Sequence, residues 1–187
     1  MSFADELRAR DPAGESARIL GFNLQKDTAA LTEILKRACT AASEADRRSV
    51  SVYCTSRQDD GYTEYGYIEE LPTVRDCERE AEEFNRGKYT TYSRFHSASS
   101  GTYETRLYGQ LICFGPDRLD YAGKLQESLR SEIGGMGFTS FDVTLAELDD
   151  IYVVHERRRA FMSEVLRESV SSRVAGKIYA FRLQASW

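Results

Sequence analysis

The order in which helical and strand patterns follow one another constrains the fold of this chain most. Apolar residues recur at spacings of three and four from Leu31 to Ala42, which predicts a helix over residues 28–45. Residues 49–56 then alternate, with Val50 and Val52 on one face, and this alternation predicts a strand. The turn sequence Asp59-Asp60-Gly61 leads to a second expected strand over residues 62–68. Two strands joined by a tight turn favour antiparallel pairing.

The remaining patterns continue this irregular order. Thr73, which follows Pro72, resembles a helix cap with Asp76 three residues on, and Gly87 is expected to end that helix. The other expected elements are strands over 88–96 and 102–114 joined by the polar link 97–101, a helix after Pro116 that Gly134, Gly135 and Gly137 stop, strands over 138–145 and 151–155 around a turn at Asp149-Asp150, a helix over 157–172, and a last strand over 177–185.

Hairpins between strands, rather than a regular alternation of strand and helix, favour a mainly antiparallel sheet with helices on one face. We therefore predict an α+β fold with three to four helices packed on the sheet. Residues 27–187 are expected to form a single domain, and residues 1–26 an N-terminal arm with a short helix.

Composition indicates an ordinary soluble protein. The chain has 187 residues, of which 41% are hydrophobic and 29% charged, and these values suit one domain with a core. No stretch approaches the roughly 20 apolar residues that cross a bilayer. The first residues lack the basic and apolar regions of a secretory signal. We expect a cytoplasmic protein that makes no membrane contact.

The cysteines do not suggest a metal site. Cys39, Cys54, Cys77 and Cys113 are widely spaced, whereas zinc-binding cysteines usually come in close pairs from one short turn. Cys39 and Cys77 lie on helical patterns, and Cys54 and Cys113 lie in strand patterns. We expect all four to be small buried hydrophobes in a reducing compartment, with no metal ion and no cofactor.

Charge is distributed unevenly along the chain. The net charge is −5, yet ten acidic residues fall between Asp59 and Glu83, where only Arg75 and Arg79 oppose them. Such a segment repels nucleic acid and attracts a basic protein surface. Tyrosines in the same segment favour protein contact, although tyrosine also fills half-buried sheets as a good strand former. The predicted partner-binding residues are Asp59, Asp60, Tyr62, Glu64, Tyr65, Tyr67, Glu69, Glu70, Glu78, Glu80, Glu82 and Glu83.

Two other hypotheses rest on the last third of the chain. An acidic group could hold Mg²⁺ for a small nuclease, and a solvated turn before a helix is the structural alternative. This group is Glu147, Asp149, Asp150, His155 and Glu156. Arg157, Arg158 and Arg159 could contact nucleic acid in a regulator, or they could form a charged helix face. The glycines at 134–137 end a helix, so they do not suit a phosphate-binding loop. No catalytic residue is predicted.

Several segments resemble known proteins. The opening Met1-Ser2-Phe3-Ala4-Asp5-Glu6-Leu7-Arg8 resembles the start of small accessory proteins from phages and mobile elements of Firmicutes. The Leu71-Pro72 junction, residues 148–154 and residues 177–187 are similar as well, and together these segments cover about a quarter of the chain. Some proteins of this kind are anti-CRISPR inhibitors of type II RNA-guided nucleases. The resemblance therefore implies a counter-defence role in a bacterial host cell.

These observations lead to one main hypothesis. The chain is expected to be a non-enzymatic interaction protein that binds and inhibits a host nucleic-acid enzyme. The expected partner is a host protein with a basic surface, and the resemblance points to an RNA-guided nuclease or its guide-RNA complex. Direct nucleic-acid binding is disfavoured by the net charge.

Overall fold

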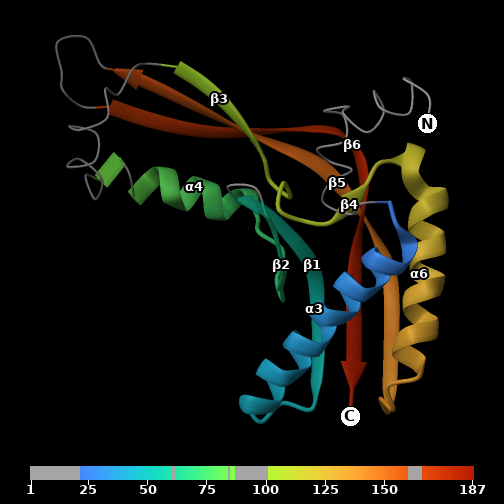
Figure 1. Ribbon diagram of the computed structural model, residues 1–187. Helices are drawn as coiled ribbons and strands as arrows, with labels where there is room; N and C mark the ends of the chain where they lie inside the picture. Colours follow the sequence, from blue (N-terminus) through green and yellow to red (C-terminus); the bar gives the residue numbers. More distant parts are fainter. Residues whose placement is uncertain (1–21, 60–61, 84, 87–100, 160–165) are drawn as a thin grey trace. The chain divides into compact units, whose positions relative to one another are not determined.

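The computed structural model describes residues 22–59, 62–83, 85–86, 101–159 and 166–187. It has an α+β fold in which one antiparallel sheet contains six strands, in the order β2-β1-β6-β5-β3, and β4 also pairs with β6 (Figure 1). The fold class agrees with the prediction. The described residues include three α-helices, where three to four were predicted. The helices are α3 (Leu24–Glu44), α4 (Val74–Glu83) and α6 (Leu119–Gly134), and a short 3₁₀ helix, η2 (Pro116–Arg118), precedes α6.

The strands differ greatly in length. They are β1 (Ser49–Asp59), β2 (Tyr62–Ile68), β3 (Gly101–Arg106), β4 (Cys113–Phe114), β5 (Ser140–Arg159) and β6 (Leu166–Ser186). β1 and β2 pair with Asp59 opposite Tyr62, as expected for the predicted hairpin, whose turn at 60–61 lies outside the described residues. The predicted arm over 1–26 also lies almost entirely outside them, and α3 begins four residues earlier than expected.

The chain divides into two compact units. Unit 1 contains residues 1–70, 110–148 and 178–187, and unit 2 contains residues 71–109 and 149–177. β5 and β6 contribute residues to both units. The expectation of a single domain over 27–187 stays a prediction.

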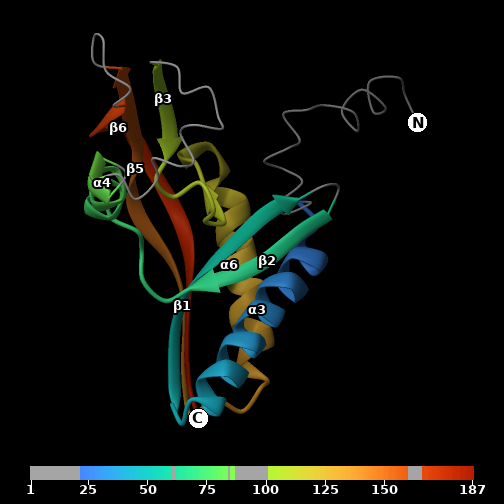
Figure 2. The same ribbon diagram turned by 90° about the vertical axis from the view of Figure 1, so that its left-hand side faces the viewer.

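The apolar core lies in unit 1. α3 and α6 lie on the same face of β1 and β6, as Figure 2 shows. The helices bury stripes at spacings of three and four, and the strands bury alternate residues, as the sequence predicted. The cluster includes Leu31, Leu35 and Ala38 from α3, Leu125, Leu129 and Ile133 from α6, Val50, Val52 and Cys54 from β1, and Phe181, Leu183 and Ala185 from β6.

Local signals in the sequence explain where these helices begin and end. Asn23 caps α3, since its side-chain oxygen accepts a hydrogen bond from the backbone N–H of Lys26 at 3.1 Å. Pro116 occupies the first turn that leads into α6, and α6 ends at Gly134 as expected. Gly137 follows with a φ of 79°, a conformation that glycine adopts at little cost.

The largest error of the sequence prediction falls on residues 138–172. Residues 140–159 form one uninterrupted strand, so no turn occurs at Asp149-Asp150. The helix expected over 157–172 does not form, because residues 157–159 end β5 and residues 166–172 begin β6. The pattern from Phe161 to Leu166 has helical spacing, but the following run Ser169–Ser172 is poor in helix-forming residues and pairs as a strand.

Two other predicted elements also change. The strand expected over 102–114 is divided into β3 and β4 by a turn at residues 107–110. The strand expected over 88–96 and its link to Gly101 fall outside the described residues, except Gly101 itself, which begins β3. The last strand begins at Leu166, well before the expected residue 177, and Gly176 lies within it.

Candidate functional site

The first part of the predicted acidic surface lies on β2 in unit 1. Tyr65 and Tyr67 point to the same face of β2 and pack, partly buried, against the apolar core. Arg37 of α3 donates a side-chain hydrogen bond to the carbonyl of Tyr65. The two tyrosines therefore fill a half-buried sheet, which is the structural alternative that the sequence left open. Glu64, on the other face, is exposed.

The acids at the end of β2 lie in different surroundings. The Glu69 carboxylate accepts hydrogen bonds from Nη2 and Nη1 of Arg47, at 2.6 and 2.8 Å. This pairing lowers the pKa of the Glu69 carboxyl. Glu70 is exposed and has no cation partner among the described residues. Asp59 and Tyr62 are the last register pair of the hairpin, and Asp60 lies outside the described residues.

The second part of the acidic surface lies on α4 in unit 2. Thr73 and Asp76 form the predicted capping box, because the Thr73 N–H donates to Asp76 at 2.8 Å and the Asp76 N–H donates to the Thr73 hydroxyl at 3.3 Å. The Thr73 hydroxyl also donates to the Asp76 carboxylate at 2.7 Å, and this bond, followed by the bond from the Thr73 N–H, lowers the pKa of the Asp76 carboxyl. Ala81 is the buried residue of this helix, while Glu78, Glu80 and Glu82 are exposed.

The ion pairs of α4 leave two of these acids without a cation. Glu82 pairs with Arg86 at 3.1 Å, whereas no described cation pairs with Glu78 or Glu80. Glu83 is partly buried. The acidic segment is thus divided between β2 of unit 1 and α4 of unit 2, and α4 exposes most of its carboxylates.

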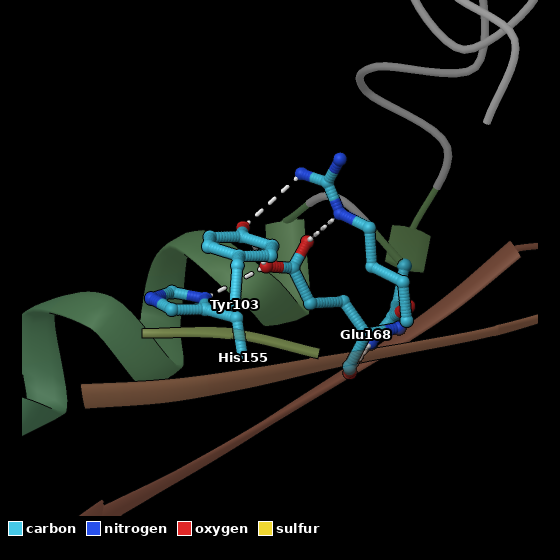
Figure 3. Close-up of polar contacts among 5 residues, drawn as sticks. Tyr103, His155 and Glu168 are labelled. Carbon is cyan, nitrogen blue, oxygen red and sulfur yellow. Dashed lines mark hydrogen bonds and ion pairs between the residues drawn. The ribbon is translucent and has the colours of Figure 1, made fainter. Parts of the chain in front are cut away.

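Unit 2 contains a polar cluster around Glu168 that the sequence did not indicate. Glu168 of β6 accepts hydrogen bonds on one carboxylate oxygen from the Tyr103 hydroxyl and from Nδ1 of His155, both at 2.8 Å (Figure 3). The Tyr103 and His155 rings stack with centroids 4.7 Å apart. Nε of Arg157 lies 3.5 Å from the second carboxylate oxygen. Only 5% of the Glu168 side chain is exposed.

The register of the strands brings these residues together. Tyr103 of β3 is the direct cross-strand partner of His155 in β5, and Arg157 lies two residues further on the same face. Asn85, just after α4, clasps the backbone of Glu168: its amide donates to the Glu168 carbonyl at 2.7 Å and accepts from the Glu168 N–H at 2.8 Å. This side chain makes the two bonds that a neighbouring strand would make.

The cluster has an evident structural role. Among the described residues of unit 2, only Ala81, Val153 and Glu168 are buried, so a carboxylate takes a place that apolar side chains hold in unit 1. Partial burial, together with the hydrogen bond to Glu168, raises the pKa of the Tyr103 phenol. A histidine oriented by a carboxylate is also the arrangement of a general base, but His155 is itself largely buried, at 13% exposure of its side chain.

The acids of the predicted Mg²⁺ group do not come together. Asp149 and Asp150 are neighbours in a strand, so their side chains point to opposite faces of the sheet. Asp149 forms an ion pair with Lys177 at 2.9 Å. Asp150 accepts hydrogen bonds from Nε and Nη2 of Arg106, at 2.5 and 3.0 Å. Glu156 pairs with Arg158. Glu147 accepts a long hydrogen bond from Tyr179, at 3.4 Å.

Three arginines expected on one helix face lie instead on a strand. Arg157 joins the Glu168 cluster, and its Nη2 donates to the Tyr103 hydroxyl at 3.2 Å. Arg158 points to the opposite face and is 80% exposed. The backbone of Arg159 ends β5. Because alternate residues of a strand face opposite ways, Arg157 and Arg158 cannot form one basic patch.

The four cysteines lie in the predicted elements, and all are free thiols. Cys54 is fully buried, which raises the pKa of its thiol, whereas Cys39, Cys77 and Cys113 are partly exposed. In the described part of the chain, no group of three or more His, Cys, Asp or Glu residues is placed to hold a metal ion. No helix in this part is long and apolar enough to cross a membrane.

The chain was compared with known protein families, with curated proteins and with solved structures, and none of the three comparisons found a match.

Proposed function

We propose that this chain is an interaction protein that binds a partner with a basic surface, and that α4 provides the main acidic contact. The observation that carries this proposal is the exposure of the α4 carboxylates. Glu78, Glu80 and Glu82 face solvent on a helix that buries only Ala81 among its described side chains. Exposed surface carboxylates speed association with a basic partner and favour it over other surfaces.

The narrower proposal names the partner. We propose a nucleic-acid enzyme of a bacterial host, specifically a type II RNA-guided nuclease or its guide-RNA complex, which this chain inhibits in the cytoplasm. Such enzymes hold nucleic acid in positively charged channels, which an acidic helix could enter. The segments that resemble small phage and mobile-element proteins support this choice of partner, and the acidic helix supports only the basic character of the contact.

Capture experiments test the proposal. Wild-type chain, immobilised through its C-terminus, is exposed to a host lysate that contains an RNA-guided nuclease, and the captured enzyme is tested for DNA cleavage. The matched variant carries Glu78→Lys, Glu80→Lys, Glu82→Lys and Glu83→Lys. Lysine has nearly the same helix propensity as glutamate, so α4 is expected to form in the variant.

We expect the wild-type chain to capture an enzyme that no longer cleaves DNA, and the variant to capture no enzyme. Release should be steep as salt rises, because exposed charges are screened. A control variant reverses Asp120, Glu127 and Glu132, which are exposed on α6. Equal loss in both variants would show that net charge, rather than α4, determines binding. Retained capture by the α4 variant would contradict the proposal.

A further inference from the structure

α4 is too short to keep its direction without contacts to the rest of unit 2. It has ten residues, and isolated helices shorter than about 12–15 residues are only marginally stable in water. Its capping box at Thr73 and Asp76 is a local contact, which fixes where the helix begins but not where its axis points. Among its described side chains, Ala81 is buried, and Val74 and Cys77 are the partly buried apolar ones. This apolar contact is small, so α4 needs a further anchor.

Asn85 supplies this anchor, because it joins the C-terminal end of α4 to β6. α4 lies beside β6 in unit 2, as both ribbon views show (Figure 1, Figure 2). The Asn85 amide nitrogen donates to the Glu168 carbonyl at 2.7 Å, and its oxygen accepts from the Glu168 N–H at 2.8 Å. One planar amide thus meets both backbone groups of one residue, which restricts the angle as well as the distance. We call these two hydrogen bonds the Asn85 clasp.

The exposed carboxylates of α4 do not all lie on one side of the helix. Glu78 and Glu82 are four residues apart and so are neighbours on the helix surface, whereas Glu80 lies on another side. A turn or tilt of α4 therefore changes which carboxylates a partner meets. A single exposed charge pair contributes little to binding, so tight binding requires several carboxylates to be presented together in one fixed direction.

We propose that Asn85 is a positioning residue for partner binding, because its clasp on the β6 backbone holds α4 in the direction in which its carboxylates meet the basic partner. This inference rests on the proposed function, and it adds to that function an uncharged residue outside the acidic surface. The apparent affinity for the partner falls with the fraction of chains in which α4 is correctly placed. Contacts that hold α4 in place before binding also remove the cost of ordering it in the complex.

The direct test measures the association and dissociation rates of the full chain with a purified type II RNA-guided nuclease. Asn85→Ala leaves every charge of α4 in place, so its association rate should stay within about twofold of wild type. Its dissociation rate should rise about tenfold, because two hydrogen bonds no longer hold α4 in the complex. Asn85→Asp should not restore slow dissociation, although it adds an acidic charge, since a carboxylate cannot donate to the Glu168 carbonyl.

Glu168→Gln is the matched control for a general loss of stability in unit 2. It weakens the hydrogen bonds of the Glu168 side chain to Tyr103 and His155, but it keeps the backbone groups that Asn85 holds. At a temperature at which both variants remain folded, Glu168→Gln should dissociate within about twofold of the wild-type rate. Equally fast dissociation of both variants would overturn the positioning role, because loss of stability alone would then explain the effect.

Hydrogen exchange of the Glu168 amide gives a readout that a purely structural role would not change. If a closed clasp presents the α4 that binds, the bound partner must favour the closed clasp by the same factor. Glu168 is buried, and its N–H is the group that Asn85 holds. We expect saturating nuclease to slow this exchange about tenfold in wild type, matching the change in dissociation rate, and to leave it unchanged in Asn85→Ala. Equal exchange in free and bound wild type would contradict the positioning role.

The positioning role and the proposed function fail differently. No binding of the nuclease by the wild type at any concentration would remove the proposed function, and the positioning role with it. Binding by the wild type, together with equally slow dissociation of Asn85→Ala, would overturn the positioning role alone and leave the α4 contact standing.

Discussion

The carboxylate of Glu168 is buried in unit 2, at a position where an apolar side chain is usual. Tyr103 and His155 donate to one of its oxygens, and Arg157 lies near the other. A buried carboxylate is stable only with such partners, because its transfer from water is costly. The three partners come from β3 and β5, so one side chain connects these strands with β6.

Glu168→Gln tests this dependence. The amide presents a donor to Arg157 and keeps only one acceptor for Tyr103 and His155, so we expect unit 2 to lose about 2 kcal/mol of stability. Hydrogen exchange of the β3 and β6 amides measures this loss. Glu156→Gln, whose side chain is 40% exposed, is the control and should cost less than about 0.5 kcal/mol. Equal exchange rates in wild type and Glu168→Gln would contradict the role of the carboxylate.

Tyr121 makes the stability of unit 1 depend on pH in the alkaline range. Its hydroxyl donates to the buried carboxylate of Asp27, and partial burial, followed by this bond and the Asp27 charge, raises the pKa of the phenol. The folded state therefore keeps a proton that the unfolded state loses above about pH 10. The stabilisation is complete below that pH and declines as the pH rises further.

Tyr121→Phe should remove most of this decline. At pH 7 the variant should be about 1–3 kcal/mol less stable, because Asp27 loses a donor while it stays buried. Between pH 9 and 11 its free energy of unfolding should fall less than that of the wild type. Chemical denaturation over this pH range measures both effects. Parallel pH profiles for the two proteins would show that Tyr121 does not carry the dependence.

Elements with a clear period could be predicted from the sequence, and elements set by long-range pairing could not. α3, α6 and the β1–β2 hairpin follow from repeated apolar spacing and turn residues. β5 and the first part of β6 do not, because Asp149-Asp150 has the composition of a turn and 161–166 has helical spacing. In the structure, Lys177 and Arg106 neutralise those two acids across strands, which the sequence alone does not reveal.

The candidate sites show the same division. The acids of α4 could be located because the capping box and the apolar spacing define the helix locally. The Glu168 cluster joins residues as far as 83 positions apart and depends on strands that were expected to be a helix. The signal that could have corrected this expectation was the pair of β-branched residues Val170 and Val174, in a run of serines that is poor in helix-forming residues.

Asn85, which follows α4, forms hydrogen bonds with the backbone of β6. Asn85→Ala removes both hydrogen bonds to the backbone of Glu168, so the Glu168 amide should exchange with solvent about tenfold faster. The α4 amides should also exchange faster if the clasp holds the helix. Arg86→Ala is the control, since this exposed side chain pairs only with exposed Glu82 among the described residues. Unchanged exchange at Glu168 would show that the clasp contributes nothing.

At the scale of the whole molecule, the two units differ in how they are held together. Unit 1 has an apolar core between its sheet and two helices, whereas the described part of unit 2 centres on a polar cluster and exposes an acidic helix. A polar, sparsely buried unit costs little to reorganise, and such regions commonly carry binding surfaces. Because of this contrast, we assign the main partner contact to α4.

The most direct test of that assignment is the inhibition of a purified type II RNA-guided nuclease, measured as DNA cleavage at increasing concentrations of each chain. We expect wild type and the α6 control variant to inhibit equally. Reversal of Glu78, Glu80, Glu82 and Glu83 should abolish inhibition while the unfolding transition stays within about 1 kcal/mol of wild type. Undiminished inhibition by the folded α4 variant, or no inhibition by the wild type at any concentration, would contradict the assignment of the main contact to α4.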